Sequence, residues 1–200
     1  MQSTLEFKDQ TIPILFKEDN IQFLLLNTSW SVDEFFPGRS SINKAGFSIG
    51  LKGADEQIKH SGSNESILRV AVGHHPLTGN DKIKDDAFVE LLQKDRFKIY
   101  MHGHVHEPKK ELLFHYDPER IHIIGSGSFG APAYDRPESV PLVYNLAKLE
   151  RDCGKVRVYT RSKNRVGGAW GPHSIWSTGS STSNESYYDI DLAEKSRQLQ

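Results

Sequence analysis

The stretch from Leu68 to Met101 constrains the fold more than any other part of the chain. Leu68–Val72 is rich in β-branched residues and predicts a buried strand, and Phe97–Met101 predicts a second strand. Between them, apolar residues at helical spacing predict a helix with Asp81 as N-cap or first-turn acid, ending near Asp95. These apolar residues are Ile83, Ala87, Phe88, Leu91 and Leu92. A strand, a helix and a strand in this order form a βαβ unit, so we expect two parallel neighbouring strands and an α/β chain.

Three further pairs of apolar segments predict β-hairpins, because each pair flanks a polar or turn-forming sequence. The pairs are Pro13–Phe16 with Ile21–Leu26, Glu111–Tyr116 with Ile121–Ile124, and Leu142–Leu149 with Val156–Arg161. Asn27–Ser66 is rich in Gly, Ser and Lys, and we expect a long excursion with at most one short helix. We expect a domain over residues 1–171, a Ser/Thr-rich linker over 172–187, and a tail over 188–200 that can form a short helix.

Composition argues against several classes of function. The chain has 200 residues and a net charge of -1, so no basic field indicates binding to nucleic acid or to an anionic membrane. Its single cysteine permits no intrachain disulfide, which favours a reducing compartment. The N-terminus is too polar for a signal peptide, and the longest apolar runs are too short to cross a bilayer. We therefore expect a soluble, cytoplasmic protein.

Histidines follow both strands of the βαβ unit. His74 and His75 come after the first strand, and His102, His104 and His106 come after the second. Because ligands bind beyond the carboxyl ends of parallel strands, we expect these imidazoles to lie close together. Three imidazoles without thiolates suit a catalytic zinc, iron or manganese ion better than a structural one. A catalytic ion of this kind favours a hydrolytic reaction.

The residues around these histidines suit a rigid site. Gly73 and Gly103 allow close approach of the backbone, and Gly103 is expected to bend the chain before His104. Pro76 and Pro108 stiffen the two loops. The remaining histidines have no such context and are expected to be ordinary: His60, His115, His122 and His173.

Gly73-His74-His75-Pro76, followed after a helix by Gly103-His104-Val105-His106 and then by the Gly125–Gly130 loop, resembles the C-terminal half of a calcineurin-like metallophosphoesterase. The resemblance covers roughly residues 21–161. It implies a four-layer α/β/β/α sandwich with mixed sheets. It also implies hydrolysis of phosphate mono- or diesters by a metal-activated water at a dinuclear centre of manganese, iron or zinc.

The resemblance assigns roles residue by residue. By the family pattern, His74 and His104 bind one metal ion and His106 binds the other. His75 occupies the variable place between ligand and proline, and His102 lies just before the second motif. We assign His75 and His102 to supporting the ligands or facing the substrate. No catalytic acid or base is identified.

The N-terminal motifs of the family are absent. The sequence contains no Asp-x-His, no Gly-Asp-x-x-Asp and no Gly-Asn-His, which supply the acidic ligands and an asparagine and histidine of the site. The chain is therefore expected to be a fragment, a split gene product or a truncated form, with the missing N-terminal half as partner. Without the bridging carboxylate, which would offset the charge of two close cations, we expect weak metal affinity and little activity from the chain alone.

Other interpretations stay open. A mononuclear zinc hydrolase can place His74, His104 and His106 around one ion with water in the fourth position. A metallo-β-lactamase-like site also uses His-x-His, but has an aspartate where this chain has Pro108. A cupin-like barrel is a partial match through His104, His106 and Glu111, although cupins are nearly all β. A degenerate phosphoesterase domain acting as a binding module is the non-enzymatic alternative.

Overall fold

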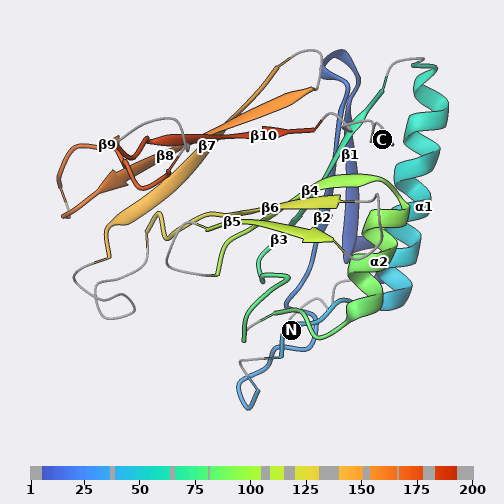
Figure 1. Ribbon diagram of the computed structural model, residues 1–200. Helices are drawn as coiled ribbons and strands as arrows, with labels where there is room; N and C mark the ends of the chain where they lie inside the picture. Colours follow the sequence, from blue (N-terminus) through green and yellow to red (C-terminus); the bar gives the residue numbers. More distant parts are fainter. Residues whose placement is uncertain are drawn as a thin grey trace, which may run out of the picture. The chain divides into compact units, whose positions relative to one another are not determined.

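The computed structural model describes residues 6–36, 39–63, 66–80, 82–104, 109–114, 120–130, 140–150, 154–165, 167–177 and 183–192. The chain divides into two compact units, Met1–Ser128 and Phe129–Gln200, each of which is described by itself (Figure 1). In the part of the chain that is described, no helix has the length and apolar character needed to cross a membrane.

The first unit is built on a six-stranded mixed sheet. Its strands are β1 (Thr11–Phe16), β2 (Ile21–Leu26), β3 (Leu68–Gly73), β4 (Phe97–His102), β5 (Lys109–Phe114) and β6 (Arg120–Gly125), in the order β1-β2-β3-β4-β6-β5. The four central strands are parallel, and the two edge strands run antiparallel to their neighbours. Short 3-10 helices, η1 (Phe7–Asp9) and η2 (Lys17–Asp19), precede and follow β1. The predicted α/β class is confirmed.

The predicted βαβ unit is also confirmed, with helix α2 (Asp86–Lys94) between the parallel strands β3 and β4. Its start was predicted wrongly. The N-cap is Asp85, in an extended conformation, whereas Asp81 lies outside the described residues. The reason is that Ile83 packs into the core from the preceding loop, where its N–H donates to the Pro76 carbonyl at 2.9 Å.

Residues 44–61 overturn the expectation of an irregular excursion, because they form the long helix α1 (Lys44–Ser61). Gly46, Gly50 and Gly53 lie along the side of the helix that faces η1 and β1. A Cβ at Gly46 would come within 2.8 Å of the Gln10 Cβ, and one at Gly50 would meet the side chain of Thr11. Gly46 and Gly50, which would weaken an isolated helix, are therefore needed here for close packing against the segment Phe7–Thr11, whereas a Cβ at Gly53 would make only an ordinary contact with Pro13.

Both helices cover the same face of this sheet, and they lie beside each other in Figure 1. Leu24, Ala71, Tyr100 and Ile123 occupy one row across β2, β3, β4 and β6. They form one buried cluster with apolar residues of the helices, namely Phe47, Leu51 and Ala54 of α1 and Phe88 and Leu92 of α2. This packing fixes the strands whose carboxyl ends carry the histidines.

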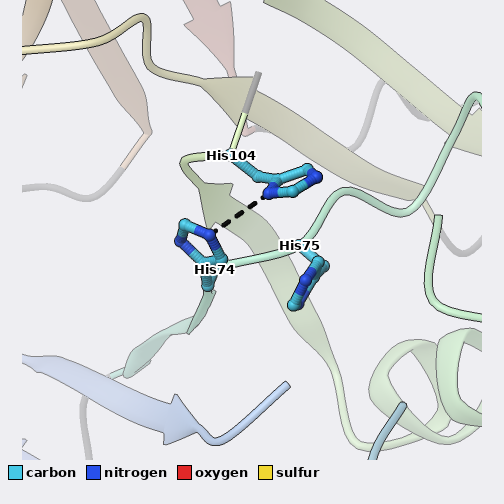
Figure 2. Close-up of side chains that lie close together, drawn as sticks. All are labelled: His74, His75 and His104. Carbon is cyan, nitrogen blue, oxygen red and sulfur yellow. Dashed lines mark hydrogen bonds between the residues drawn. The ribbon is translucent and has the colours of Figure 1, made fainter. Parts of the chain in front are cut away.

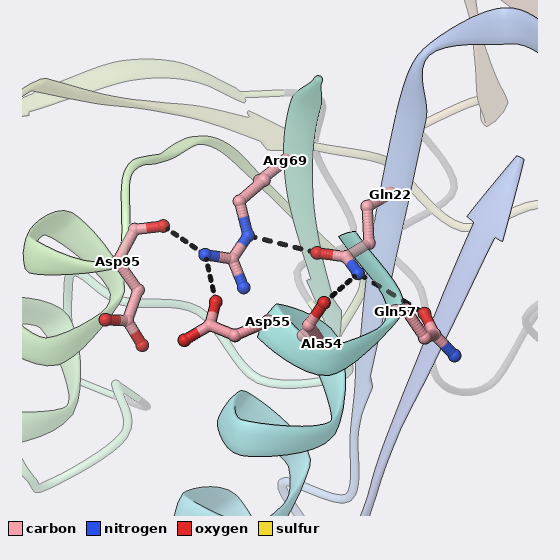
Figure 3. Close-up of polar contacts among 6 residues, drawn as sticks. All are labelled: Gln22, Ala54, Asp55, Gln57, Arg69 and Asp95. Atoms are coloured by element: carbon pink, nitrogen blue, oxygen red, sulfur yellow. Dashed lines mark hydrogen bonds and ion pairs between the residues drawn. The ribbon is translucent and has the colours of Figure 1, made fainter. Parts of the chain in front are cut away.

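A buried polar network ties the opposite end of the sheet to the helices. Arg69 of β3 donates from Nε to Gln22 Oε1 at 3.0 Å and from Nη1 to the Asp95 carbonyl at 2.7 Å (Figure 3). The same Nη1 lies 3.0 Å from Asp55 Oδ1 of α1, and Gln22 Nε2 donates to the Ala54 carbonyl at 2.8 Å. Burial lowers the pKa of the Arg69 guanidinium, and the nearby carboxylates oppose that shift.

The second unit contains a four-stranded sheet of β7 (Leu142–Leu149), β8 (Lys155–Lys163), β9 (Gly171–Pro172) and β10 (Tyr187–Asp191). The predicted β7–β8 hairpin is confirmed, as are the β1–β2 and β5–β6 hairpins of the first unit. The expected helical tail is wrong for residues 188–191, which belong to β10. Tyr188 and Ile190 alternate with exposed or half-buried residues and are both buried, a strand period rather than a helical one.

Candidate metal centre

The site lies where three parallel neighbouring strands end. Leu25 of β2 pairs with Val72 of β3, and Gly73 of β3 pairs with His102 of β4, so the carboxyl ends of the three strands share one edge. Thr28 follows β2, His74 and His75 follow β3, and His104 follows β4. Segments that are far apart in the sequence thus meet at the position where α/β sheets bind ligands.

Three imidazoles converge at this edge, those of His74, His75 and His104 (Figure 2). One nitrogen of each lies within 4.8 Å of the other two. His74 Nε2 and His104 Nδ1 lie 3.2 Å apart, within hydrogen-bonding distance of each other. A tetrahedral ion with metal–nitrogen bonds of about 2.05 Å separates two ligand nitrogens by about 3.3 Å. The His74–His104 pair therefore has the spacing of two ligands on one ion.

The electrostatic surroundings favour the ligating form of His74. Burial lowers the pKa of this imidazole below its ordinary value of 6.5, and the nearby His104 lowers it further. A metal binds the neutral imidazole, whose ring nitrogen has a free lone pair. His74 is thus held in the neutral form that metal binding requires at neutral pH.

The backbone at His104 departs from the expectation. Gly103 was expected to bend the chain, but the residue with a left-handed conformation is His104, at φ 62°. A non-glycine residue in this region is uncommon and costs free energy. A Cβ on Gly103 would lie 3.7 Å from His74 Nδ1, an ordinary contact. The bend is therefore made by the candidate ligand itself, which turns its ring toward His74.

His75 is buried and hydrogen-bonded, whereas His74 is exposed. Its ring is buried, and its Nδ1 lies 2.8 Å from Thr28 Oγ1. The same hydroxyl oxygen accepts the backbone N–H groups of His74 and His75, both at 3.1 Å. On the other side, the buried Tyr100 hydroxyl donates to the His75 carbonyl at 2.7 Å. The turn that carries His74 and His75 is thus anchored from both neighbouring strands.

The other predicted site residues have separate outcomes. His102 is buried at the end of β4, where its Nδ1 lies 2.9 Å from the Gly103 carbonyl oxygen, and it is not part of the imidazole group. His106 and Pro108 lie outside the described residues, so the assignment of His106 stays a prediction. Within the residues that the structure describes, no carboxylate belongs to the imidazole group. The cupin alternative is wrong, because the described chain has helices packed on a largely parallel sheet.

Sequence reasoning missed Thr28 and Tyr100 as parts of the site. β2 was predicted only as a hairpin partner of β1, so its parallel pairing with β3 was not expected. A polar residue just after an apolar strand, at the edge where other strands end in histidines, is the signal that could have identified Thr28. Tyr100 lies within β4 and resembles an ordinary core aromatic until its hydroxyl partner is seen.

No family model matches the chain, and no curated protein matches its sequence. Similar solved structures include purple acid phosphatase PPD1 from yellow lupin (Lupinus luteus) seeds, with a TM-score of 0.48 and 13% identity, covering 96% of this chain and 34% of that chain. Another is Vps29 complexed with Zn²⁺ from Entamoeba histolytica, with a TM-score of 0.30 and 12% identity, covering 86% of this chain and 99% of that chain. The chain spans about a third of the lupin phosphatase. These similarities are too low to indicate a function, so the function is inferred from the side chains of the site.

Proposed function

We propose that this chain supplies imidazole ligands to a calcineurin-like, metal-dependent hydrolase of phosphate mono- or diesters. The observation that carries the proposal is the 3.2 Å approach of His74 Nε2 and His104 Nδ1 at the shared edge of β3 and β4. The order of Gly73-His74-His75-Pro76 and Gly103-His104-Val105-His106 along a βαβ unit supports the same conclusion. The four-layer sandwich and the cytoplasmic location remain predictions.

The donor set fits the ions that the proposal needs. Imidazole nitrogens bind zinc, iron and manganese, and among the residues that the structure describes the group contains imidazoles only. When bound, the ions would activate a water and polarise the phosphate ester. The roles of the chain are to hold the first ion through His74 and His104 and, in the complete site, the second through His106. Hydrogen bonds with Thr28 and Tyr100 hold the turn that carries His74.

An isolated chain is expected to be a poor catalyst. The imidazole group includes no carboxylate among the residues that the structure describes. Two neighbouring cations repel each other strongly unless anionic ligands lie between them. We therefore propose that acidic ligands are supplied by a partner with the Asp-x-His, Gly-Asp-x-x-Asp and Gly-Asn-His motifs, which this sequence lacks.

Metal titration tests the proposed ligands directly. Zinc and manganese binding to the full chain is measured by isothermal titration calorimetry, and the bound metal is counted by elemental analysis. His74→Ala and His104→Ala should each abolish most of the binding, since each removes one of two ligands on the same ion. His60→Ala is the matched control, because His60 is exposed on α1 and contacts the Glu56 carbonyl. Equal binding by all three variants would contradict the site.

Activity is tested with 4-nitrophenyl phosphate and bis(4-nitrophenyl) phosphate in the presence of manganese. The chain alone should give little turnover, and addition of the motif-bearing partner should raise it. No turnover even with that partner would favour the non-catalytic binding module. Turnover by the chain alone at a complete enzyme's rate would refute the need for a partner.

A mononuclear zinc hydrolase is the second candidate, and one observation favours it. A third imidazole, that of His75, lies within the 4.8 Å group with His74 and His104. Three histidines and a water complete a tetrahedral zinc site without any other chain. One tightly bound zinc ion per chain, together with turnover that needs no partner, would select this candidate over the dinuclear one.

A further inference from the structure

We infer that Thr28 is a positioning residue with two effects: its hydroxyl keeps the ring of His75 from binding the metal, and it holds the backbone of His74 so that the ring of His74 can bind. Among the three imidazoles of the group, His74 and His104 are then the metal ligands. The inference rests on the proposed metal site and refines it. It separates two histidines that are adjacent in sequence and both within reach of the same ion.

Three nitrogen atoms surround the hydroxyl of Thr28 at hydrogen-bonding distance. The Oγ1 of Thr28 lies 3.1 Å from the backbone nitrogens of His74 and His75, and both of these groups are donors. A hydroxyl oxygen has two lone pairs and one hydrogen. With both lone pairs accepting these N–H groups, the remaining hydrogen is directed to the third neighbour, His75 Nδ1, at 2.8 Å. Thr28 is therefore the donor in this bond and His75 Nδ1 is the acceptor.

The tautomer of His75 follows from this bond. A neutral imidazole carries its hydrogen on one nitrogen only, so accepting at Nδ1 places the hydrogen on Nε2. The Nδ1 lone pair is engaged by Thr28, and the Nε2 atom has no lone pair for a cation. His75 therefore cannot coordinate an ion without losing the Thr28 bond or the Nε2 hydrogen. His74 differs because its contact with Thr28 is made by the backbone, which leaves its ring to face His104.

The backbone contacts give Thr28 its second role. The turn at His74 and His75 leaves β3 between Thr28, which follows β2, and Tyr100 of β4. Gly73 lies so close to both that an added Cβ would meet Thr28 Cγ2 at 2.8 Å and would also strike the Tyr100 hydroxyl. Partners that orient metal ligands commonly change metal affinity by about 10- to 100-fold when removed. Thr28 is such a partner, because its hydroxyl holds the backbone of His74.

The test compares Thr28→Val, which keeps the shape and removes the hydroxyl, with Thr28→Ser, which keeps the hydroxyl. Thr11→Val is the matched control, because Thr11 is also buried and its Oγ1 has no hydrogen-bond partner among the described residues. Nitrogen-15 NMR of the full chain reports the ring nitrogens of His75 directly. In the wild type and Thr28→Ser, Nδ1 should resonate as an unprotonated nitrogen and Nε2 as a protonated one. Thr28→Val should lose this pattern, and Thr11→Val should keep it.

Zinc titration then measures the consequence for binding. We expect Thr28→Val to weaken zinc binding by about 10- to 100-fold, with recovery in Thr28→Ser and no change in Thr11→Val. His75→Gln should retain more affinity than His74→Gln or His104→Gln. Addition of zinc should move the ring resonances of His74 and His104 while His75 keeps its tautomer.

The outcomes separate this inference from the proposed function. If the wild type binds no zinc, the metal proposal fails, while the NMR pattern of His75 still decides the role of Thr28 in the tautomer. If zinc binds but His75 changes tautomer on binding, or His75→Gln loses as much affinity as His74→Gln, the inference is overturned and the three-histidine site is favoured. Unchanged zinc affinity in Thr28→Val overturns the positioning role.

Discussion

Gly73→Ala tests the packing that brings the candidate ligands together. Gly73 is the last residue of β3 and immediately precedes His74. A Cβ at this position would lie 2.8 Å from Thr28 Cγ2, 3.2 Å from Tyr100 Cζ and closer still to the Tyr100 hydroxyl. Tyr100 is fully buried in β4, so its ring has little freedom to move aside. The substitution should therefore displace either the tyrosine or the turn at His74 and His75.

The expected cost has two parts. Forcing one extra carbon into a well-packed region costs about 1–3 kcal/mol. Displacing Tyr100 also breaks its hydrogen bond to the buried turn, and a typical intramolecular hydrogen bond contributes about 1 kcal/mol. Together, Gly73→Ala should lower the free energy of unfolding by about 2–4 kcal/mol. Alanine is otherwise compatible with a strand, and Gly73 has no positive φ, so backbone strain adds nothing.

The assay is urea unfolding followed by circular dichroism. Gly103→Ala is the matched control, because its Cβ would make only an ordinary 3.7 Å contact with His74 Nδ1, and its free energy of unfolding should stay near the wild-type value. Tyr100→Phe removes the hydroxyl that a Cβ on Gly73 would strike, so Gly73→Ala should cost less in that background than in the wild type. Equal stability of Gly73→Ala and Gly103→Ala, or strict additivity with Tyr100→Phe, would refute the packing argument.

Three further perturbations test contacts within the two units, two in the first and one in the second. Asn43→Ala should cost about 1 kcal/mol in urea unfolding, because the Asn43 side chain caps α1 by accepting the Gly46 N–H at 2.8 Å; Asn43→Asp, which keeps the cap, should cost less. Arg69→Met should lower the free energy of unfolding by about 2–4 kcal/mol, because it leaves Gln22 Oε1 and the Asp95 carbonyl without this donor (Figure 3). The control is Lys52→Met at an exposed position, which should change the urea midpoint little. Bonds from Arg157 and Lys155 hold the pKa of Asp189 at about 2, below its ordinary 3.8, so its stabilisation is complete above pH 3.8 and is lost as the pH falls toward 2. Asp189→Asn should flatten that acid limb of the stability profile, and an unchanged slope would contradict the assignment.

The elements of the βαβ unit could be predicted from the sequence, because their signals are local. A short β-branched run, apolar residues at helical spacing and a second apolar run are visible without knowledge of distant contacts. The placement of His74 and His104 followed from the same logic, since parallel strands must end at one edge. The same local period could have identified β10, where Tyr188 and Ile190 alternate with more exposed neighbours.

Other features could not be predicted because they depend on residues far apart in the chain. Three glycines within Lys44–Ser61 weaken the local case for a helix, and contacts with Gln10 and Thr11 explain two of them, Gly46 and Gly50. The left-handed backbone at His104 could not be predicted either, because glycine adopts this conformation most readily and the adjacent residue is Gly103.

The sequence by itself determined the chemistry available at the end of the sheet, which is a set of imidazoles following two parallel strands. Only the tertiary structure decided which imidazole faces which partner. His74 and His75 are neighbours in sequence with the same side chain, yet one ring approaches His104 and the other accepts a hydrogen bond from Thr28. The physical reason is that Thr28 reaches the turn through the parallel pairing of β2 with β3, a contact that no local pattern encodes.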